Sequence, residues 1–241
     1  MPELPEVETI KETLKRQILG KRIINVDTRY EKIVKNESVG DFRNEIAGQS
    51  FRAIRRKGKY LFFDLDKNTL VVHLRMEGKF FLKPETDPYE KHEHVIFHLA
   101  DHMTMRYDDM RKFGTMQLVG LNRETDVEGV AKLGYEPFDK NFTSYYLRDK
   151  LGKSSAPIKS ALLDQTVVCG LGNIYVDEVL FRSKVNPKRQ ASGLSMREYD
   201  AIVRNSRIVL TKAIELGGST IRSYVSSLGV TGRFQNELMV H

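Results

Sequence analysis

The sequence has very little cysteine: Cys169 is the single one among 241 residues. One cysteine excludes an intrachain disulfide and any metal site built from several cysteines, and it is typical of a protein in a reducing compartment. No apolar run is long enough to span a bilayer. The N-terminus, Met-Pro-Glu-Leu-Pro-Glu-Val-Glu, lacks the basic start and apolar stretch of a signal peptide. We therefore expect a cytoplasmic globular protein.

Positive charge is in excess, with 39 Lys and Arg against 32 Asp and Glu, a formal net charge of +7. A basic balance favours a polyanionic partner such as nucleic acid. Two stretches concentrate the charge: Arg52, Arg55, Arg56, Lys57 and Lys59 in the first, and Lys184, Lys188 and Arg189 in the second. Ordinary solvated surface charge explains either stretch alone equally well.

Apolar residues between residues 4 and 19 recur three and four positions apart, at Leu4, Val7, Ile10, Leu14 and Ile18. This spacing predicts one buried face of a helix. Pro5 is tolerated in a first helical turn, and Gly20 suits the helix end. The amine of the chain therefore lies just ahead of a helix N-terminus.

From about residue 22 to 120 the sequence predicts β-structure. Short aromatic or β-branched stretches alternate with polar turns, at 60–65, 69–74, 80–82, 95–99 and 103–107. We expect a β-sandwich or flattened barrel with the first helix packed against it. Residues 122–142 have a mixed, loop-like composition.

Helical patterns dominate afterwards, at 143–151, 157–166, 173–184 and 196–216. The last of these is the clearest, because Ser195 and Glu198 form a capping-box pattern and two glycines follow its end. The tight turn Gly170–Asn173 ends in an asparagine that suits the cap of the next helix. The fold class expected is α+β, with an N-terminal domain at 1–130, a linker at 131–142 and a helical domain at 143–241.

The N-terminus also carries candidate chemistry. An α-amine titrates at about 7.7–8.0, well below the about 10.4 of lysine, so part of it is a neutral nucleophile at pH 7. Removal of Met1 exposes Pro2 as a secondary amine that can attack a sugar C1′, expel a base and leave an iminium. Glu3 and Glu6 are near enough in sequence to act as a general acid and as a charge that holds the amine. From spacing alone, a simpler interpretation is favoured: Pro2 permits methionine removal and Pro5 starts a helix.

A series of motifs follows one another along the whole sequence. The first is Pro2-Glu3-Leu4-Pro5-Glu6-Val7-Glu8-Thr9. The following blocks lie at 55–61, 73–79, 109–114, 162–165, 170–178 and 217–222. In content and order these blocks resemble the formamidopyrimidine-DNA glycosylases, and blocks this long and in this order do not arise by chance.

The resemblance implies a helix-backed β-sandwich joined to a helix–two-turn–helix domain. It also implies that Pro2 is the Schiff-base nucleophile and that Glu3 is the acid that helps open the sugar and protonate leaving groups. Lys59 matches the family's catalytic lysine, which contacts phosphate and assists elimination. Without the family, Lys59 would be interpreted as a surface charge at a strand end.

The family also implies a set of DNA-binding residues. An extruded base leaves a void in the duplex, and Met76, Arg111 and Phe113 match the three residues that fill it. From pattern alone, Met76 and Phe113 would be core residues. Further expected contacts are His92, Lys159 and Asn173, and more weakly Lys153, since the stretch 152–155 is less basic than in the family. Glu77 and a loop with Thr220, Arg222 and Tyr224 align with regions that meet the flipped base, although a mobile loop explains 219–224 equally well.

Two departures from the family pattern matter. Members of the family continue into a zinc finger with four cysteines and a catalytic arginine, whereas this sequence stops at Leu238-Met239-Val240-His241. We therefore expect no cofactor within these residues, and one zinc ion only in a longer form; the chain is then a truncated or an incomplete enzyme. If Met1 stays attached, the nucleophile is blocked.

The function expected is a monomeric, nucleoid-associated base-excision-repair enzyme. It would excise 8-oxoguanine and formamidopyrimidines from double-stranded DNA, through a Schiff base and β/δ-elimination, and would act at abasic sites. An enzyme for oxidised pyrimidines is a near rival, against which Leu4, Val7 and residues 111–113 argue. The alternative from another class is a lesion- or abasic-site-binding protein without efficient turnover, because the finger is missing.

Overall fold

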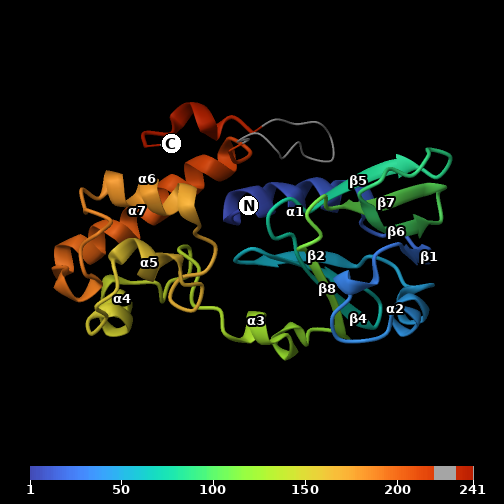
Figure 1. Cartoon of the computed structure of the whole chain (residues 1–241), viewed down its shortest axis with the longest axis horizontal. Helices are drawn as coiled ribbons and strands as arrows, with labels where there is room; N and C mark the ends of the chain where they lie inside the picture. Colours follow the sequence, from blue (N-terminus) through green and yellow to red (C-terminus); the bar gives the residue numbers. More distant parts are fainter. Residues whose placement is uncertain (220–231, 241) are drawn as a thin grey trace. The chain divides into compact units, whose positions relative to one another are not determined.

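The computed structural model describes residues 1–219 and 232–240 (Figure 1). The described chain forms two compact units, of which the first comprises residues 1–2 and 7–131 and the second residues 3–6, 132–219 and 232–240. The N-terminal helix therefore contributes to both. The domain limits expected from the sequence stay a prediction, because compactness does not show which segments fold or act independently.

The first unit contains two four-stranded antiparallel sheets. One has the order β1 (Ile23–Thr28), β6 (Glu93–Leu99), β7 (Met103–Asp108) and β5 (Lys79–Pro84); the other has β2 (Ala53–Lys57), β3 (Tyr60–Asp64), β4 (Asn68–His73) and β8 (Thr115–Gly120). With the helical second unit, this confirms the α+β fold expected from the sequence.

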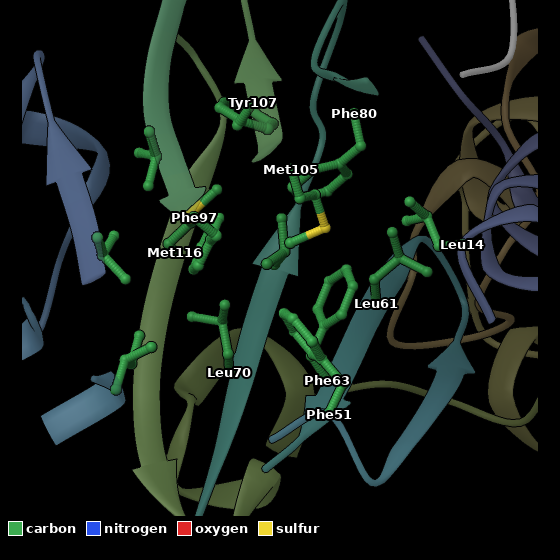
Figure 2. Packing of buried hydrophobic residues seen from close by; sticks show 14 of the residues in the cluster. Leu14, Phe51, Leu61, Phe63, Leu70, Phe80, Phe97, Met105, Tyr107 and Met116 are labelled. Atoms are coloured by element: carbon green, nitrogen blue, oxygen red, sulfur yellow. The ribbon is translucent and has the colours of Figure 1, made fainter. Parts of the chain in front are cut away.

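Aromatic and aliphatic side chains from both sheets fill the core of the first unit (Figure 2). The phenyl ring of Phe63 lies 5.5 Å from that of Phe80, between strands of opposite sheets. Helix α1 (Leu4–Ile18) adds Val7, Ile10, Leu14 and Ile18 to this core, all but fully buried. The three-and-four spacing in the sequence is thus the spacing of the buried face.

Helix α2 (Val39–Ile46) was missed by the sequence analysis, which assigned the whole region to β-structure. Gly40 and Asn44 are weak helix formers, and only eight residues are helical. The helix is specified by its cap, since the Ser38 side chain accepts from the amide of Asp41, and by the burial of Phe42 and Ile46. The loop-like stretch 122–142 also contains short helical turns, η2 (Glu124–Asp126) and α3 (Glu128–Ala131); η1 (Glu31–Ile33) lies earlier in the unit.

The second unit is built on α4 (Ser144–Leu151), α5 (Ile158–Leu163), α6 (Asn173–Arg182) and α7 (Met196–Glu215), with the turns η3 (Ala191–Gly193) and η4 (Phe234–Glu237). The capping box of Ser195 and Glu198 is present at the start of α7. The expectation that Asn173 caps α6 was wrong: Gly172 is the N-cap residue, and Asn173 is already helical. Among the described residues, no helix combines the length and the apolar character needed to cross a membrane.

Candidate active site

The carboxylate of Glu3 is buried against the N-terminus of α6. It accepts hydrogen bonds from the backbone amides of Gly172 (2.6 Å), Ile174 (3.1 Å) and Tyr175 (3.4 Å). The amides at a helix N-terminus have no partner within the helix and carry partial positive charge, so a carboxylate is stabilised there. Glu3 therefore does the capping that the sequence analysis assigned to Asn173.

A tight chain crossing permits this contact. A Cβ at Gly172 would lie 2.4 Å from Cδ of Glu3, so a larger residue would displace the carboxylate. The amide of Leu4 donates to the carbonyl of Gly170 at 3.0 Å. The glycine turn before α6 thus holds the peptide that carries Glu3 and accommodates its side chain.

Glu6 is the centre of a second buried network. Its carboxylate accepts from the Tyr175 hydroxyl (2.5 Å), the Ser219 amide (2.8 Å) and the amide of Glu3 (2.9 Å). Burial raises the pKa of Glu6, against the opposing effect of these hydrogen bonds. Burial and the neighbouring Glu6 raise the pKa of Tyr175 well above its usual value, so its hydroxyl remains a donor. Glu6 thereby fixes the peptide that follows Pro2.

Tyr175 and Ser219 are the partners that the sequence analysis missed. Both lie inside motifs that it recognised, at 170–178 and 217–222. Only the fold brings them to Glu6. Pro2 itself is buried, and in this sequence Met1 precedes it, so its nitrogen belongs to a peptide bond.

In the first unit, Lys59 lies in the two-residue connection between β2 and β3, where Lys57 pairs with Tyr60. Its side chain is buried, with 5% of the residue exposed. The ring of His73 contacts Tyr60 edge-on, with centroids 4.5 Å apart. Burial, together with the charges of Arg75 and Lys59, lowers the pKa of His73 to about 3. His73 is therefore a neutral side chain beside Lys59, and the sequence analysis did not single it out.

The basic stretch around Lys59 is largely paired within the protein. Arg52 contacts Asp66, Arg55 contacts Asp64 and Glu124, and Arg56 contacts Glu8. Because these charges are already neutralised locally, the stretch offers less positive charge to a polyanion than its composition indicates.

The three residues expected to fill a duplex void are exposed. Met76 is 38% exposed and Phe113 is 52% exposed, so neither is the core residue that the pattern alone favoured. Arg111 is exposed too, with its guanidinium carbon 4.8 Å from the ring centre of Phe113. Glu77, next to Met76, is partly exposed.

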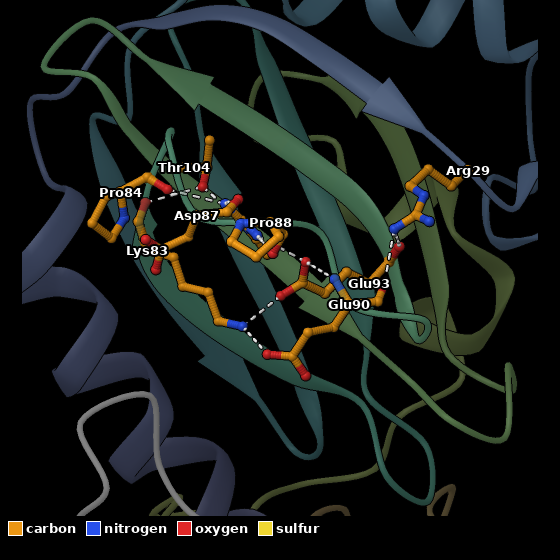
Figure 3. Close-up of polar contacts among 9 residues, drawn as sticks. Arg29, Lys83, Pro84, Asp87, Pro88, Glu90, Glu93 and Thr104 are labelled. Atoms are coloured by element: carbon orange, nitrogen blue, oxygen red, sulfur yellow. Dashed lines mark hydrogen bonds and ion pairs between the residues drawn. The ribbon is translucent and has the colours of Figure 1, made fainter.

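His92 is partly exposed at the end of the loop between β5 and β6. Arg106 is fully buried on β7 and anchors this loop. Figure 3 shows Pro84, Asp87, Pro88 and Glu93, which form or flank the loop. The guanidinium donates to the carbonyls of Pro84, Asp87 and Pro88, to Glu93 and to Thr104. All five donors of the guanidinium are thus used: four bind residues within 84–93, which form or flank the loop, and one binds Thr104 on β7 itself.

The remaining expected DNA contacts lie in the second unit. Asn173 is exposed at the first residue of α6, and Lys153 is exposed two residues after α4. Lys159 is partly exposed and forms an ion pair of 2.8 Å with Asp177. Thr220, Arg222 and Tyr224 lie outside the described residues.

The described residues do not fit a metal ion. Within 1–219 and 232–240 there is no group of three or more His, Cys, Asp or Glu side chains able to hold one. The thiol of Cys169 is buried and donates to the carbonyl of Gly134. The zinc expected for the family has no ligand set in this part of the chain.

Two family models match the chain. The formamidopyrimidine-DNA glycosylase N-terminal domain matches residues 1–116, and the formamidopyrimidine-DNA glycosylase H2TH domain matches residues 133–225. The class of protein is therefore a DNA glycosylase with a β-sandwich and a helix–two-turn–helix domain.

Relatives and solved structures agree with this class. The formamidopyrimidine-DNA glycosylases of Listeria monocytogenes and Oceanobacillus iheyensis are 44% and 46% identical, over all of this chain and 88% and 86% of theirs. The chain is also similar to a crystal structure of wild-type Lactococcus lactis Fpg (MutM) in complex with DNA that contains N7-benzyl-Fapy-dG. The TM-score is 0.92 at 41% identity, and the match covers all of this chain and 88% of that one. A complex of the Lactococcus lactis Fpg with DNA containing an abasic site also has a TM-score of 0.92, at 41% identity over 98% of this chain and 86% of that one. The chain belongs to the formamidopyrimidine-DNA glycosylase family and is a DNA glycosylase and AP lyase.

Proposed function

We propose that this chain excises oxidised purines, 8-oxoguanine and formamidopyrimidines, from double-stranded DNA and then cleaves the strand at the resulting abasic site. The observation that carries the proposal is the buried Glu3 and Glu6 network, which fixes the peptide next to Pro2. The Lactococcus lactis Fpg, a relative crystallised with DNA containing N7-benzyl-Fapy-dG and with DNA containing an abasic site, supports the choice of substrate.

In the proposed reaction, the Pro2 amine, freed by removal of Met1, attacks C1′ of the damaged nucleotide. The C1′–base bond breaks with the electron pair leaving on the base, which is protonated. The Pro2 nitrogen then loses its proton, and ring opening, with a proton delivered to O4′, gives an iminium between Pro2 and C1′. Loss of a C2′ proton expels the 3′ phosphate, and a second elimination, with loss of a C4′ proton, expels the 5′ phosphate. Water finally hydrolyses the bond between Pro2 and C1′, which releases the sugar remnant as an aldehyde and restores the amine.

Glu3 is the proposed proton donor and acceptor of these steps. Glu6 is a positioning residue, because its carboxylate holds the amide of Glu3 and does not itself need to reach the sugar. Lys59 is proposed to contact a backbone phosphate and assist elimination. A lysine contributes a point charge there, which suits a leaving phosphate.

DNA is proposed to contact His92, Arg111, Lys159, Asn173 and Lys153, with Met76, Arg111 and Phe113 filling the void left by the extruded base. Exposed side chains of this kind are able to enter a base stack and bond the orphaned partner. Glu77, with Thr220, Arg222 and Tyr224, is proposed to face the flipped base. Because the proposed substrate is double-stranded DNA, we propose that the enzyme works at the bacterial nucleoid in the cytoplasm, as a monomer and without a cofactor in these residues.

Borohydride trapping tests the function directly. A duplex with one 8-oxoguanine opposite cytosine should give a covalent adduct with protein whose Met1 is removed, and none with protein that retains Met1. An adduct on an abasic duplex alone would refute the assigned lesion. Bound DNA without an adduct on either duplex would make this chain a binding protein.

Glu3→Gln tests the acid. We expect it to slow base excision far more than cleavage at a preformed abasic site. The matched control is Glu12→Gln on α1, the helix that follows Glu3, where the side chain is 45% exposed and pairs with Lys11. Equal losses of both activities in Glu3→Gln would contradict the assigned role.

A further inference from the structure

Tyr107 on β7 is fully buried beneath the two loops that carry Met76 and the Arg111–Phe113 segment. Its ring packs 5.2 Å from that of Phe80, and both are labelled in the core view of Figure 2. The Tyr107 hydroxyl lies 3.3 Å from Oδ2 of Asp109, to which it donates. Both residues have 0% exposure, so this polar pair is built into the core of the first unit.

Two glycines touch this hydroxyl from different loops. A Cβ at Gly114 would lie 1.7 Å from Oη of Tyr107, and a Cβ at Gly78 would lie 2.3 Å from the same atom. Gly78 follows Met76 by two residues, and Gly114 follows Phe113 directly. One phenolic oxygen therefore contacts the backbone of both loops, 74–78 and 109–114, which we call the insertion loops.

The Asp109 carboxylate organises the second insertion loop. Its Oδ1 accepts from the amide of Arg111 (3.1 Å), and its Oδ2 accepts from the amide of Gly114 (2.8 Å). Between these, Lys112 adopts a φ of 58°, an uncommon conformation for a residue with a side chain. The carboxylate provides the compensating contacts that hold this turn.

The first insertion loop is fixed by backbone contacts. The amide of Gly78 donates to the carbonyl of Leu74 at 3.0 Å, and the amide of Arg75 donates to Nδ1 of His73 at 3.0 Å. Met76 projects into solvent between these two anchored ends. Both insertion loops are thus hydrogen-bonded at the base and exposed at the tip.

We propose that Tyr107 and Asp109 are positioning residues that lock the two insertion loops in one relative placement, so that Met76, Arg111 and Phe113 enter the duplex together. The inference rests on the proposed function, since it assumes that these tips fill the void left by a flipped base. Groups held in place before binding lose less conformational entropy when they insert. The pair should therefore act on the step in which the damaged base leaves the stack.

Asp109→Asn and Tyr107→Phe test the proposal. Asparagine has one acceptor oxygen in place of two, so its NH2 group would face the backbone amide of Arg111 or of Gly114, and two donors would oppose each other. We therefore expect excision from an 8-oxoguanine duplex to slow about tenfold to thirtyfold in Asp109→Asn. Tyr107→Phe removes only the hydroxyl, and we expect a loss of about threefold to fivefold. The matched control is Tyr199→Phe, which removes a buried hydroxyl bonded to the Ala191 carbonyl in the second unit.

The readout is a comparison of substrates in single-turnover experiments. A duplex with a preformed abasic site has no base to unstack, so the variants should cleave it at close to the wild-type rate. With 2-aminopurine beside the lesion, the fluorescence rise that reports unstacking should slow by the same factor as excision.

Each other outcome overturns the inference. Equal losses on both substrates, or a loss matched by Tyr199→Phe, would mean a general effect on stability. Wild-type rates in both variants would remove the role altogether. Failure of the wild-type protein to excise the lesion would instead refute the proposed function, and the two failures are therefore distinguishable.

Discussion

Replacing Gly172 by alanine should displace the Glu3 carboxylate without removing it, and it therefore tests whether the position of this carboxylate matters. Gly172 has φ −136° and ψ −162°, which alanine adopts without strain. The added Cβ would meet Cδ, Oε1 and Cγ of Glu3 at 2.4, 2.5 and 2.8 Å. Because these atoms form the flexible end of a side chain, the carboxylate should leave the α6 N-terminus while the backbone stays in place.

The energetic cost follows from the hydrogen bonds that would break. Three backbone amides would no longer have the carboxylate as acceptor. Hydrogen bonds to a charged group contribute about 1.5–3 kcal/mol each, and water recovers part of that, so we expect a net loss of about 2–3 kcal/mol in the free energy of unfolding. Base excision should fall about 10–100-fold, because a displaced acid no longer lies near the reacting sugar.

Urea unfolding and single-turnover excision are the two assays. Gly193→Ala is the matched control, since an added Cβ there meets nothing within 4 Å and its φ is not positive. The Gly193→Ala variant should show only a small increase in the free energy of unfolding, about 0.4–1 kcal/mol, because alanine restricts the unfolded chain more than glycine does. If Gly172→Ala matched Gly193→Ala in both assays, the Glu3 contacts would be irrelevant to stability and catalysis.

Three further outcomes are expected. Arg106→Lys should weaken DNA binding several-fold, because the loop that carries His92 loses its anchor. In a His92→Ala background the same substitution should have no further effect on DNA binding. If the two losses of affinity were additive in a double-mutant cycle, Arg106 would not act through His92. Ser195→Ala should lower the free energy of unfolding by about 1 kcal/mol through loss of the α7 cap, as measured by urea unfolding. Burial, with Glu45 and Asp41 nearby, raises the pKa of Glu37 to about 7, and within the described residues its Oε1 is buried without a hydrogen-bond partner. The folded state thus binds the proton more tightly, so stability should fall as pH rises from about 4.5 to 7, by about 1 kcal/mol after solvent screening; a pH profile unchanged in Glu37→Gln would contradict this.

The sequence by itself determined the class of fold and the enzyme family. The spacing of apolar residues in α1 and in the strands predicts their buried faces directly, because side-chain spacing in a helix or strand is fixed by local geometry. The capping box at Ser195 is equally local. Family membership could be predicted from the sequence because the motifs are long and collinear. The short helix α2 could not be predicted, since its eight residues are held mainly by burial and a cap.

Only the tertiary structure decided how the candidate site is assembled. Glu3 lies 169 positions before Gly172, the N-cap residue of α6 whose amide its carboxylate binds. No local pattern specifies that a carboxylate at the start of the chain caps a helix so far along it, so the cap was assigned to Asn173. Exposure of Met76 and Phe113, and the single phenolic oxygen between Gly78 and Gly114, likewise depend on how strands pack. Contacts between distant segments follow from the packing of the whole chain, which short-range spacing does not encode.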